Sequence, residues 1–583
     1  MSKLLKKQAR RDWPYLLMIL FVAALLWSEI LHQPYVGGLD SYFHMNSFYE
    51  DAMQLKTGHF SYFLSAFGFN RSGRIVNALY GPGINYFAAG LLLLCGNWAR
   101  FSLVTSFLVM LVGGMGMYHL DVAMHVRQID ALVLALAYVM GHWFLVAWVG
   151  NGEFTGLESA LMPFVILAGC RILLDRRVRV VPLAVLMAIL LQIHLMTSII
   201  ATLALLFFFV GGWLKSTHRW RMLLDGIGAA ALAGLLSGNV WSAVWDVMSS
   251  NQLLPTFPQF NLQAYGSRLV SLGTLTLILL AIVIIDSIIE FRKVNWSSRL
   301  ILLIGLIFLW LSSTHFPWNF LTRKWQMLAS LIQFPQRFLP VFSVIFNLVL
   351  GLLVTRWSRN KTFHRIPAAG MDLLLLLLVA TALRPAFNYT NWLTRVWYRP
   401  VVVRYYNHFH YNLHNANQIR RAFRSPDLKL GVSAIEKRTS DYLPLPHRFV
   451  LRDFGDYPFH RAMNRQLIDN HFQPQKRLAH GSLILTWWNR DSVGHWQVLP
   501  LVKYRHTKLW ANGRLIHPHL TLIGAVKYHD RPGFNRLVTR YQPGIIFELM
   551  SIAMPLTWLI LLIVEMIRCF WPRLWMKIWV NLD

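Results

Sequence analysis

The chain has 583 residues, of which 55% are hydrophobic and 14% are charged, and this composition excludes an ordinary soluble protein. Its formal net charge is +30, so basic residues dominate the polar segments. No phosphate-binding glycine loop, dinucleotide-binding glycine pattern or zinc-protease motif occurs, which disfavours nucleotide-driven transport.

Apolar segments of membrane-spanning length recur along the chain, since a crossing helix needs about 20 predominantly apolar residues. The first follows a basic start, and no small-residue cleavage site comes after it, which predicts an uncleaved membrane anchor. We expect twelve spans, near residues 14–31, 101–119, 131–149, 157–174, 180–194, 196–214, 222–246, 269–290, 299–313, 338–356, 371–386 and 543–568.

Six basic segments predict the side of the membrane that each loop occupies, because cytoplasmic loops are enriched in Lys and Arg. Successive cytoplasmic segments must be separated by an even number of crossings. Twelve spans with both termini in the cytoplasm satisfy this condition. The short apolar stretch 84–94 is therefore expected to be re-entrant or to lie on the surface, since a crossing there would place the basic loop 176–179 outside. The six segments are the N-terminus, 176–179, 215–221, 292–293, 356–365 and 568–577.

The expected fold is a polytopic α-helical membrane protein of the plasma membrane with a β-containing extracytoplasmic domain. Alternating apolar segments and turn signals such as Asn512-Gly513 predict strands in a long polar insertion. Its excess of Lys and Arg favours an anionic neighbour. We expect a transmembrane domain over 1–386 with a site-bearing outer loop 32–100, an extracytoplasmic α/β or β-rich domain over 387–542, and a final span with a basic tail over 543–583.

Asp40 lies a few residues beyond the first span, and His44 follows it one helical turn later. A carboxylate at the membrane surface can act as a general base toward an acceptor hydroxyl. It can also bind a divalent metal together with His44, since positions i and i+4 share a helix face. Capping of the helix 41–55 is the alternative, and spacing alone favours it. Glu50 and Asp51, farther along this helix, are expected on a solvated face.

Two further acids flank the start of a later span. Glu153 lies in a very short outer loop, where surface exposure is the favoured interpretation, and Glu158 lies at the mouth of the span. Acids inside a membrane usually face a cavity or a partner, so Glu158 is a candidate for either a functional role or a structural ion pair. His194 marks an expected turn between two spans, and a packing role is favoured for it over a ligand role.

Arg337 lies at the outer mouth of a span between prolines and aromatic residues. A guanidinium there can hold a phosphate in bidentate fashion, or it can extend to lipid headgroups. Gln336 and Arg323 are further candidates for phosphate binding, although anchoring at the membrane surface is favoured for Arg323.

Six short motifs follow one another along nearly the whole chain: Gly38-Leu39-Asp40-Ser41-Tyr42-Phe43-His44, Tyr80-Gly81-Pro82-Gly83, Gly152-Glu153, Gln336-Arg337-Phe338, Asp441-Tyr442-Leu443-Pro444 and Tyr541-Gln542-Pro543-Gly544. In their order and spacing they resemble the GT-C membrane glycosyltransferases. More narrowly, the chain resembles the bacterial YfhO-like proteins and their relatives labelled as related to 6-pyruvoyl-tetrahydropterin synthase.

The resemblance implies an inverting glycosyltransferase that uses a polyprenyl-phosphate sugar on the extracytoplasmic face. It implies a base or metal-associated acid at Asp40, assisted by His44 and by Glu153 or Glu158, and a donor-phosphate contact at Arg337. The candidate cofactor is a divalent metal ion held by Asp40 and His44. His194 and Tyr442 are auxiliary candidates.

The expected partners follow from the same resemblance and from the basic outer domain. They are a polyprenyl-phosphate-linked sugar donor, membrane lipids, and an anionic cell-envelope polymer or lipid acceptor such as a teichoic acid, whereas no nucleic acid is expected. Two functions without catalysis are the alternatives: a flippase or transporter of lipid-linked sugars, and an assembly protein for an envelope polymer.

Overall fold

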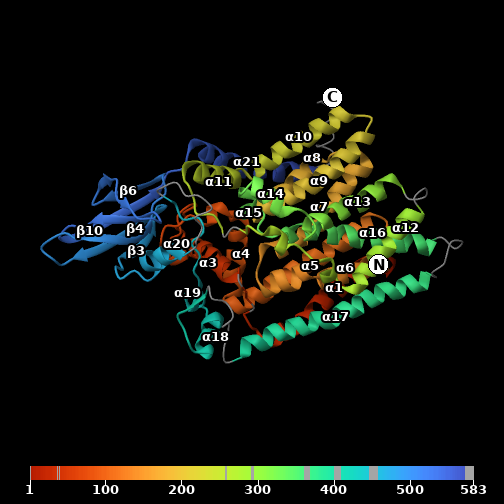
Figure 1. The fold of residues 1–583 in the computed structure, drawn as a ribbon, viewed down its shortest axis with the longest axis horizontal. Coiled ribbons are helices and arrows are strands. Elements are labelled where there is room, and N and C mark those ends of the chain that lie inside the picture. Colours follow the sequence, from red (N-terminus) through yellow and green to blue (C-terminus); the bar gives the residue numbers. More distant parts are fainter. Residues whose placement is uncertain are drawn as a thin grey trace.

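The computed structural model describes residues 2–35, 37–38, 40–256, 259–290, 295–359, 368–399, 409–445 and 457–570. A bundle of helices fills most of the elongated molecule, and a β-rich region from the C-terminal third lies at one end (Figure 1). The prediction of a mostly helical chain with a β-containing region near its C-terminus is therefore confirmed.

Seven helices in the described ranges are long and apolar enough to cross a membrane. The chain is thus a multi-pass membrane protein. The seven segments are Trp98–Ala123 (α5), Gln128–Gly150 (α6, Gln128–Val139, with η3, Trp143–Gly150), Phe154–Asp175 (α7), Leu195–Lys215 (α9), Pro335–Ser358 (largely α16, Leu339–Arg359), Asp372–Tyr398 (within α17, Ala368–Tyr398) and Ile545–Phe570 (α21).

The other expected spans fall on shorter or bent apolar helices. Each of the twelve expected spans falls on a helix or on a bent helix pair, and the number that cross stays a prediction. The additional apolar helices are α1 (Ser2–Leu25), which continues into α2 (Trp27–His32), α4 (Pro82–Cys95), α8 (Val180–Ile193), α10 (Arg219–Leu236), α11 (Gly238–Ser250), α12 (Thr274–Ile289) and α13 (Trp296–Ser312).

The expected span 222–246 falls on two helices, α10 and α11, which meet at an angle of 72°. The bend lies at Ser237, whose hydroxyl bonds back to a carbonyl one turn earlier. The carbonyl of Leu236, the last residue of α10, accepts a hydrogen bond of 2.9 Å from Trp558 Nε1 on α21. A side chain from another helix thus pairs a backbone carbonyl at the end of α10. Helix α11 therefore turns toward the β-rich region.

The remaining helices are short and lie mostly at the β-rich end or in connecting loops. They are α3 (Ser41–Thr57), η1 (Phe69–Arg71), η2 (Asn77–Leu79), η4 (Leu262–Tyr265), η5 (Leu269–Leu272), α14 (Trp318–Lys324), α15 (Met327–Leu331), η6 (Pro335–Phe338), α18 (Ala416–Arg424), α19 (Leu428–Ala434), α20 (Tyr457–Met463) and η8 (Asn464–Ile468).

Three antiparallel sheets make up the described β structure. Strand β10 is central, and alternate residues such as Leu537 are fully buried against Leu483 and Leu485, as expected for strands with one face on a core. The sheets are β1 (Phe409–Tyr411) with β2 (Ile435–Lys437); β3 (Gln475–Ala479), β4 (Ser482–Asn489), β10 (Gly533–Tyr541), β6 (Thr507–Ala511) and β7 (Arg514–Ile516) in that order; and β5 (Trp496–Val502), β9 (Ala525–His529) and β8 (His519–Leu520) in that order.

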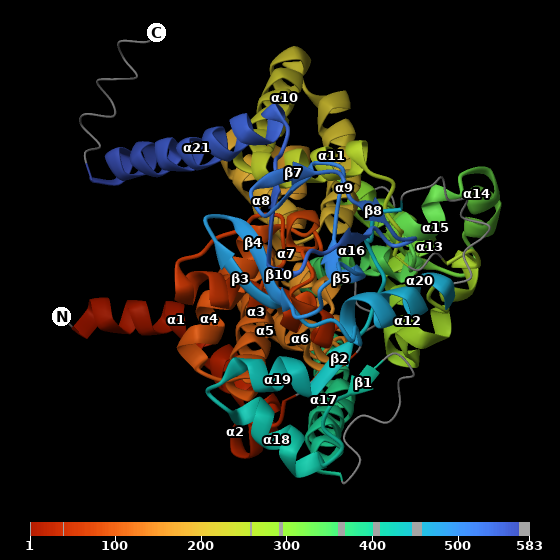
Figure 2. The same cartoon turned by 90° about the vertical axis from the view of Figure 1, so that its left-hand side faces the viewer.

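The β-rich region is bound to the loop that follows α3. Ser72 O accepts from Val502 N at 2.8 Å, and Tyr504 Oη accepts from Ile75 N at 3.1 Å. Asp246 on α11 accepts from Tyr541 Oη at 2.6 Å. These contacts join the strands to the end of the helical bundle, which they cover in the end-on view of Figure 2.

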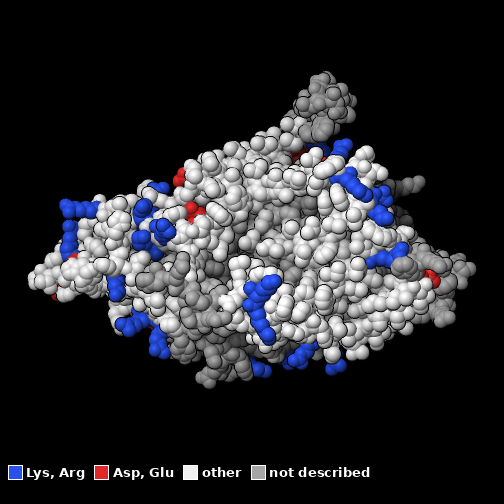
Figure 3. Space-filling view, turned by 45° about the horizontal axis from the view of Figure 1, so that its top comes forward, with Lys and Arg blue, Asp and Glu red and all other residues white. Residues whose placement is uncertain are grey.

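Charged side chains are unevenly spread over the surface. On the face in Figure 3, Lys and Arg gather over the β-rich end and over the opposite end. The wide surface between them is mostly uncharged, apart from a blue group near its middle and Lys and Arg along its lower edge. A mostly uncharged surface of this kind is typical of one that faces hydrocarbon.

Candidate active site

The first turn of α3 is held against a loop from another part of the chain. Ser41 donates both its backbone N–H and its hydroxyl to Asn151 O at 2.9 Å. Two glycines allow this approach: a Cβ on Gly38 would lie 2.3 Å from Asn151 Oδ1, and one on Gly152, whose φ is +64°, would lie 2.5 Å from Ser41 Oγ. The contact brings the loop that contains Glu153 toward Asp40.

Asp40 immediately precedes α3, but its side chain caps no backbone N–H of the helix. Its Oδ1 instead accepts a hydrogen bond of 2.7 Å from Lys437 Nζ. The Asp40 side chain remains 43% exposed, whereas that of Lys437 is 15% exposed. The capping role that spacing favours is therefore wrong for this side chain, and one side of the carboxylate is open to a substrate.

Lys437 reaches Asp40 through the small two-stranded sheet. Strand β2 ends at Lys437, which lies opposite Phe409 of β1, and the ring of Phe409 packs edge-on against Tyr42 of α3 at 4.9 Å. The next residue, Arg438, instead pairs with Asp469 at 2.8 Å. The alternation of a strand thus directs one basic residue to Asp40 and the next away from it.

Glu153 lies in the loop between η3 and α7 and is half-buried. Its Oε1 accepts from Asn151 Nδ2 at 2.9 Å, and its backbone N–H donates to Ala147 O at 2.7 Å. The preceding π-helical turn η3 ends one residue before Asn151. Such turns are rare and occur often at functional sites.

Arg337 comes from the short helix η6, more than 180 residues after Glu153. Its Nη1 donates to Ile332 O at 3.1 Å and its Nη2 to Gln333 Oε1 at 3.3 Å, so the guanidinium is held by its own segment. Its positive charge acts on both Asp40 and Glu153. The charged groups of Glu153, Arg337 and Lys437, from three distant segments, therefore lie within electrostatic range of Asp40.

The pKa values of the two carboxyl groups are moved in opposite directions. Burial opposes ionisation of Asp40, but Lys437 and, more weakly, Arg337 outweigh it, so the pKa of Asp40 lies below its ordinary value. Burial and the negative charge of Asp40 raise the pKa of Glu153 above its ordinary value. Carboxyl pairs whose pKa values are pushed apart are typical of sites where the two acids have different roles.

His44 lies in the wall of the site and is buried, with 6% of its surface exposed. Its ring stacks on Phe154, with 3.9 Å between ring centroids and an angle of 7°, and meets Tyr80 edge-on at 5.7 Å. Burial is the main reason that the pKa of His44 falls to about 3. The imidazole is therefore neutral at physiological pH.

Glu158 and His194 form a second buried pair below this wall. Glu158 Oε1 lies 3.1 Å from His194 Nδ1, and Glu158 also accepts from the Thr197 hydroxyl. His194 is extended (φ −162°) and separates α8 from α9, and Tyr80 stacks above its ring at 6.5 Å. Of the two roles open to Glu158, the arrangement favours the structural pair.

Tyr442 reaches the same place from the loop after β2, with its backbone at a positive φ of +63°. Its hydroxyl lies 3.2 Å from that of Tyr80, and its carbonyl accepts from Tyr504 Oη at 2.9 Å. The charges of Asp40 and Arg337 act on it. Tyr442 therefore links the site to the β-rich region.

Glu50 and Asp51 are buried, with 1% and 2% of their surface exposed, so the expectation of a solvated face is wrong. Glu50 accepts backbone N–H bonds of 2.7 Å from both Phe67 and Gly68. Asp51 Oδ1 accepts from Asn77 Nδ2 at 2.9 Å. The loop after α3 folds back over the helix and covers both acids.

Two other phosphate candidates differ in position. Gln336 precedes Arg337 in η6, beside the site. Arg323 is exposed on α14, and no hydrogen bond or ion pair within the described ranges connects it to Asp40, Glu153 or Arg337. The structure therefore does not bring Arg323 to the cluster.

The donor set does not fit a divalent metal. Among the described residues, no group of three or more His, Cys, Asp or Glu side chains could hold a metal ion. Asp40 and His44 would supply only two ligands, and Lys437 already donates to Asp40 Oδ1. No metal is assigned to this site.

A narrow pocket lies beside the cluster, between α3 and α5. It is lined by Ser41, His44 and Gly152 from the site and by apolar residues such as Phe48 and Phe101. Its volume is about 40 Å³, well below the roughly 300 Å³ at which ligand pockets usually begin. The accessible face of the site is therefore the open side of Asp40 rather than this pocket.

Sequence reasoning missed Lys437 and the central position of Tyr80. Lys437 gave no local signal because its partner is 397 residues away and is reached only through pairing of β1 with β2. Tyr80 belongs to a motif that the sequence singled out, but its contacts with His44, His194 and Tyr442 depend on the packing of four segments.

Comparison with known proteins gives distant likenesses to solved structures. No family model matches the chain, and no curated protein matches its sequence. The chain is similar to a cryo-EM structure of arabinofuranosyltransferase AftD from mycobacteria, with 13% identity and a TM-score of 0.39, over 65% of this chain and 27% of that one. This chain therefore spans about a quarter of that protein's length, and the function proposed below rests on the site geometry.

Proposed function

We propose that the chain is a GT-C type membrane glycosyltransferase that moves a sugar from a polyprenyl-phosphate donor to a cell-envelope polymer or glycolipid, such as a teichoic acid, on the extracytoplasmic face. The observation that carries the proposal is the contact of the Asp40 and Glu153 segments through Ser41 and Asn151, with the Lys437 ammonium on Asp40 and the charge of Arg337 acting on both acids. Two acids of different pKa beside a fixed guanidinium suit the displacement of a phosphate by a hydroxyl.

Asp40 is the proposed general base. The acceptor hydroxyl attacks the anomeric carbon, its proton passes to Asp40, and the bond from that carbon to the phosphate oxygen breaks, leaving its electron pair on the phosphate. A single displacement of this kind inverts the anomeric configuration. The pKa of Asp40 lies below its ordinary value, so the group is ionised before the acceptor arrives.

Arg337 is the proposed contact for the leaving phosphate, with Gln336 beside it. Two of its guanidinium nitrogens are hydrogen-bonded within its own segment, which fixes the group while other donors remain. A preorganised cation at the leaving oxygen lowers the barrier because charge develops there in the transition state.

Glu153 is the proposed auxiliary acid. The Lys and Arg side chains at the β-rich end of the molecule suit an anionic acceptor.

The donor contact is tested with purified protein in lipid nanodiscs and a panel of polyprenyl-phosphate sugars. Arg337→Gln should lower kcat/KM for sugar transfer by about 10²- to 10³-fold, as loss of a charge-stabilising group does in other enzymes. Arg323→Gln removes the same charge from a residue outside the cluster and should stay within about twofold of the unaltered protein.

Equal losses in the two variants would contradict the assignment of Arg337. Movement of the donor across the membrane without any glycosylated product would instead favour the transport alternative.

A further inference from the structure

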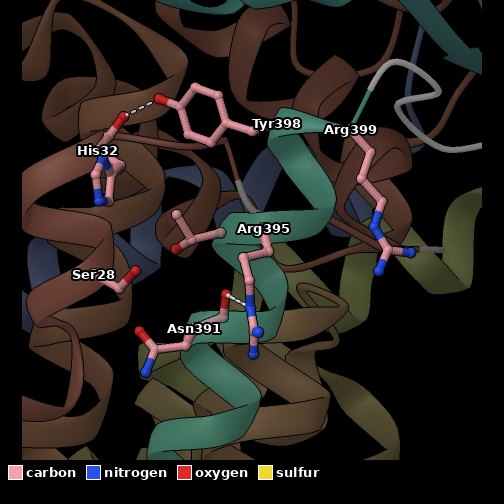
Figure 4. A pocket seen from close by; sticks show the side chains of 7 residues that line it. Ser28, His32, Asn391, Arg395, Tyr398 and Arg399 are labelled. Carbon is pink, nitrogen blue, oxygen red and sulfur yellow. Dashed lines mark hydrogen bonds between the residues drawn. The ribbon is translucent and has the colours of Figure 1, made fainter.

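A second, larger cavity lies away from Asp40, between α2 and the last turns of α17 (Figure 4). Its volume is about 810 Å³. Helix α2 contributes Ser28 and His32, and α17 with the residue after it contributes Thr394, Arg395 and Arg399. None of its lining residues belongs to the cluster around Asp40.

The lining offers hydrogen-bond donors and positive charge. Arg395 Nε makes a long bond of 3.4 Å to Asn391 O one turn earlier, and the side chains of Arg395 and Arg399 are exposed. Thr394 is 4% exposed, and its hydroxyl has no hydrogen-bond partner. No carboxylate is among the residues that line the cavity in the described part of the chain. An anionic group would therefore meet donors without a competing negative charge.

The wall of the cavity is fixed by contacts from α18. Tyr398 Oη donates to His32 O at 2.6 Å, which ties the end of α17 to the end of α2. Arg424 also donates to His32 O, at 2.5 Å, and Arg420 donates to Arg399 O at 2.7 Å. Both guanidinium groups lie over the ring of Tyr398, at 5.9 Å and 5.5 Å from its centroid. The two arginines hold the site in place and add to its positive potential.

The cavity lies at the end of a helix that is apolar and largely open to its surroundings. Asp372–Tyr398 is a candidate span, and only 17% of its apolar window is buried within the protein. Arg395 lies in the last turn of that span and Arg399 directly follows it, where a helix reaches the headgroup layer. Arginine pairs with phosphate oxygens in bidentate fashion.

We propose that this cavity binds the phosphate headgroup of an anionic membrane lipid, at a site separate from the candidate active site. The lipid tails would lie along the exposed face of α17, and the phosphate would take the donors of Arg395, Arg399 and Thr394. The occupant would tie α2 to α17 near the segment that leads to Asp40.

The test uses the full chain in nanodiscs of phosphatidylcholine mixed with an equal amount of phosphatidylglycerol, with retained lipid measured by native mass spectrometry. The unaltered protein should retain phosphatidylglycerol in preference to phosphatidylcholine. Arg395→Gln and Arg399→Gln should each reduce that preference about fivefold, the effect of about one cationic residue near a membrane surface. Arg421→Gln is the matched control, because Arg421 is exposed on α18 and does not line the cavity.

Unchanged preference in the Arg395→Gln, Arg399→Gln double variant would overturn the proposal, as would an equal loss in Arg421→Gln. Thr394→Val provides a second variant of nearly equal size, and it should weaken retention without removing charge. Excess inorganic phosphate should leave the lipid bound. Full displacement of the lipid by inorganic phosphate would show a site for the free anion and would contradict the lipid assignment.

Discussion

Lys437 determines the protonation behaviour of Asp40 in the proposed site. Burial raises the pKa of Asp40, but the Lys437 ammonium, which donates to the carboxylate at 2.7 Å, is the main group that lowers it, and with the other nearby groups it brings the pKa of Asp40 below its ordinary value. The stabilisation from this pair is present at neutral pH and is lost as the pH falls through the lowered pKa of Asp40. The same shift sets the acid side of the proposed catalytic pH profile.

Replacing Lys437 by methionine should therefore change that profile in a defined direction. Without the ammonium, the pKa of Asp40 rises, so the loss of kcat/KM on acidification should begin at a higher pH than in the unaltered protein. The measurement is sugar transfer over a pH series. Lys429→Met makes the same change at an exposed position of α19 and should leave the acid limb in place. An unshifted acid limb in Lys437→Met would contradict the role of Lys437.

At this scale the sequence predicted three of the four charged residues of the proposed site. Asp40, Glu153 and Arg337 were recognisable because each charged residue lies beside an apolar span. A charged group is costly there, so its presence indicates a structural or functional role. The partner of Asp40 could not be found in this way, since Lys437 is one of many basic residues in a basic region. The capping interpretation of Asp40 failed because its backbone is already near-helical (φ −93°, ψ −22°), whereas an N-cap residue is usually extended, and its carboxylate bonds Lys437 instead.

Helix α3 is the element that organises the loop around the site. Its two adjacent acids, Glu50 and Asp51, are both buried but have different partners. Glu50 accepts backbone N–H groups from Ala66, Phe67 and Gly68 and holds the loop that binds the β-rich region. Local sequence could not reveal this, because a covered helix face is indistinguishable from a solvated one until the covering loop is placed.

Glu50→Gln and Asp51→Asn should differ in stability although each replaces one carboxyl by an amide. The Gln side chain offers one acceptor oxygen to several N–H donors, so Glu50→Gln should lower the free energy of unfolding by about 3 kcal/mol. Asp51 Oδ1 accepts one side-chain hydrogen bond, from Asn77, and burial raises the pKa of Asp51 well above its ordinary value. Its Asn replacement keeps one acceptor oxygen and loses no buried charge that the site favours, so it should stay within about 1 kcal/mol. Thermal unfolding in detergent measures both. Equal losses would contradict the role of Glu50.

The whole molecule is a helical bundle capped at one end by strands, and the sequence predicted that division from composition. Twelve apolar segments were recognisable because each exceeds or approaches the length of a span. The bend at Ser237 could not be recognised from the sequence. It depends on Trp558 of α21, which donates a hydrogen bond to the carbonyl of Leu236 at the end of α10. Helix α17 also continues past residue 386 to Tyr398, so the expected domain boundary falls inside a helix.

The proposed topology predicts which positions are accessible from outside the cell. In a background where Cys95, Cys170 and Cys569 are replaced by alanine, Lys508→Cys on exposed β6 should react with a membrane-impermeant maleimide in intact cells. Arg177→Cys, in the basic loop between α7 and α8, should react only after permeabilisation. The reverse pattern would place the site on the cytoplasmic side.

The central claim is that Asp40 takes a proton from an acceptor during sugar transfer, and the rate of a single turnover tests it most directly. Purified protein in nanodiscs would be mixed with a polyprenyl-phosphate sugar and an acceptor, with Asp40→Asn compared with Asp491→Asn, the same change in an exposed side chain. We expect Asp40→Asn to slow transfer by about 10²- to 10⁴-fold and Asp491→Asn to have no effect. Transfer by Asp40→Asn at the unaltered rate would contradict the proposed mechanism.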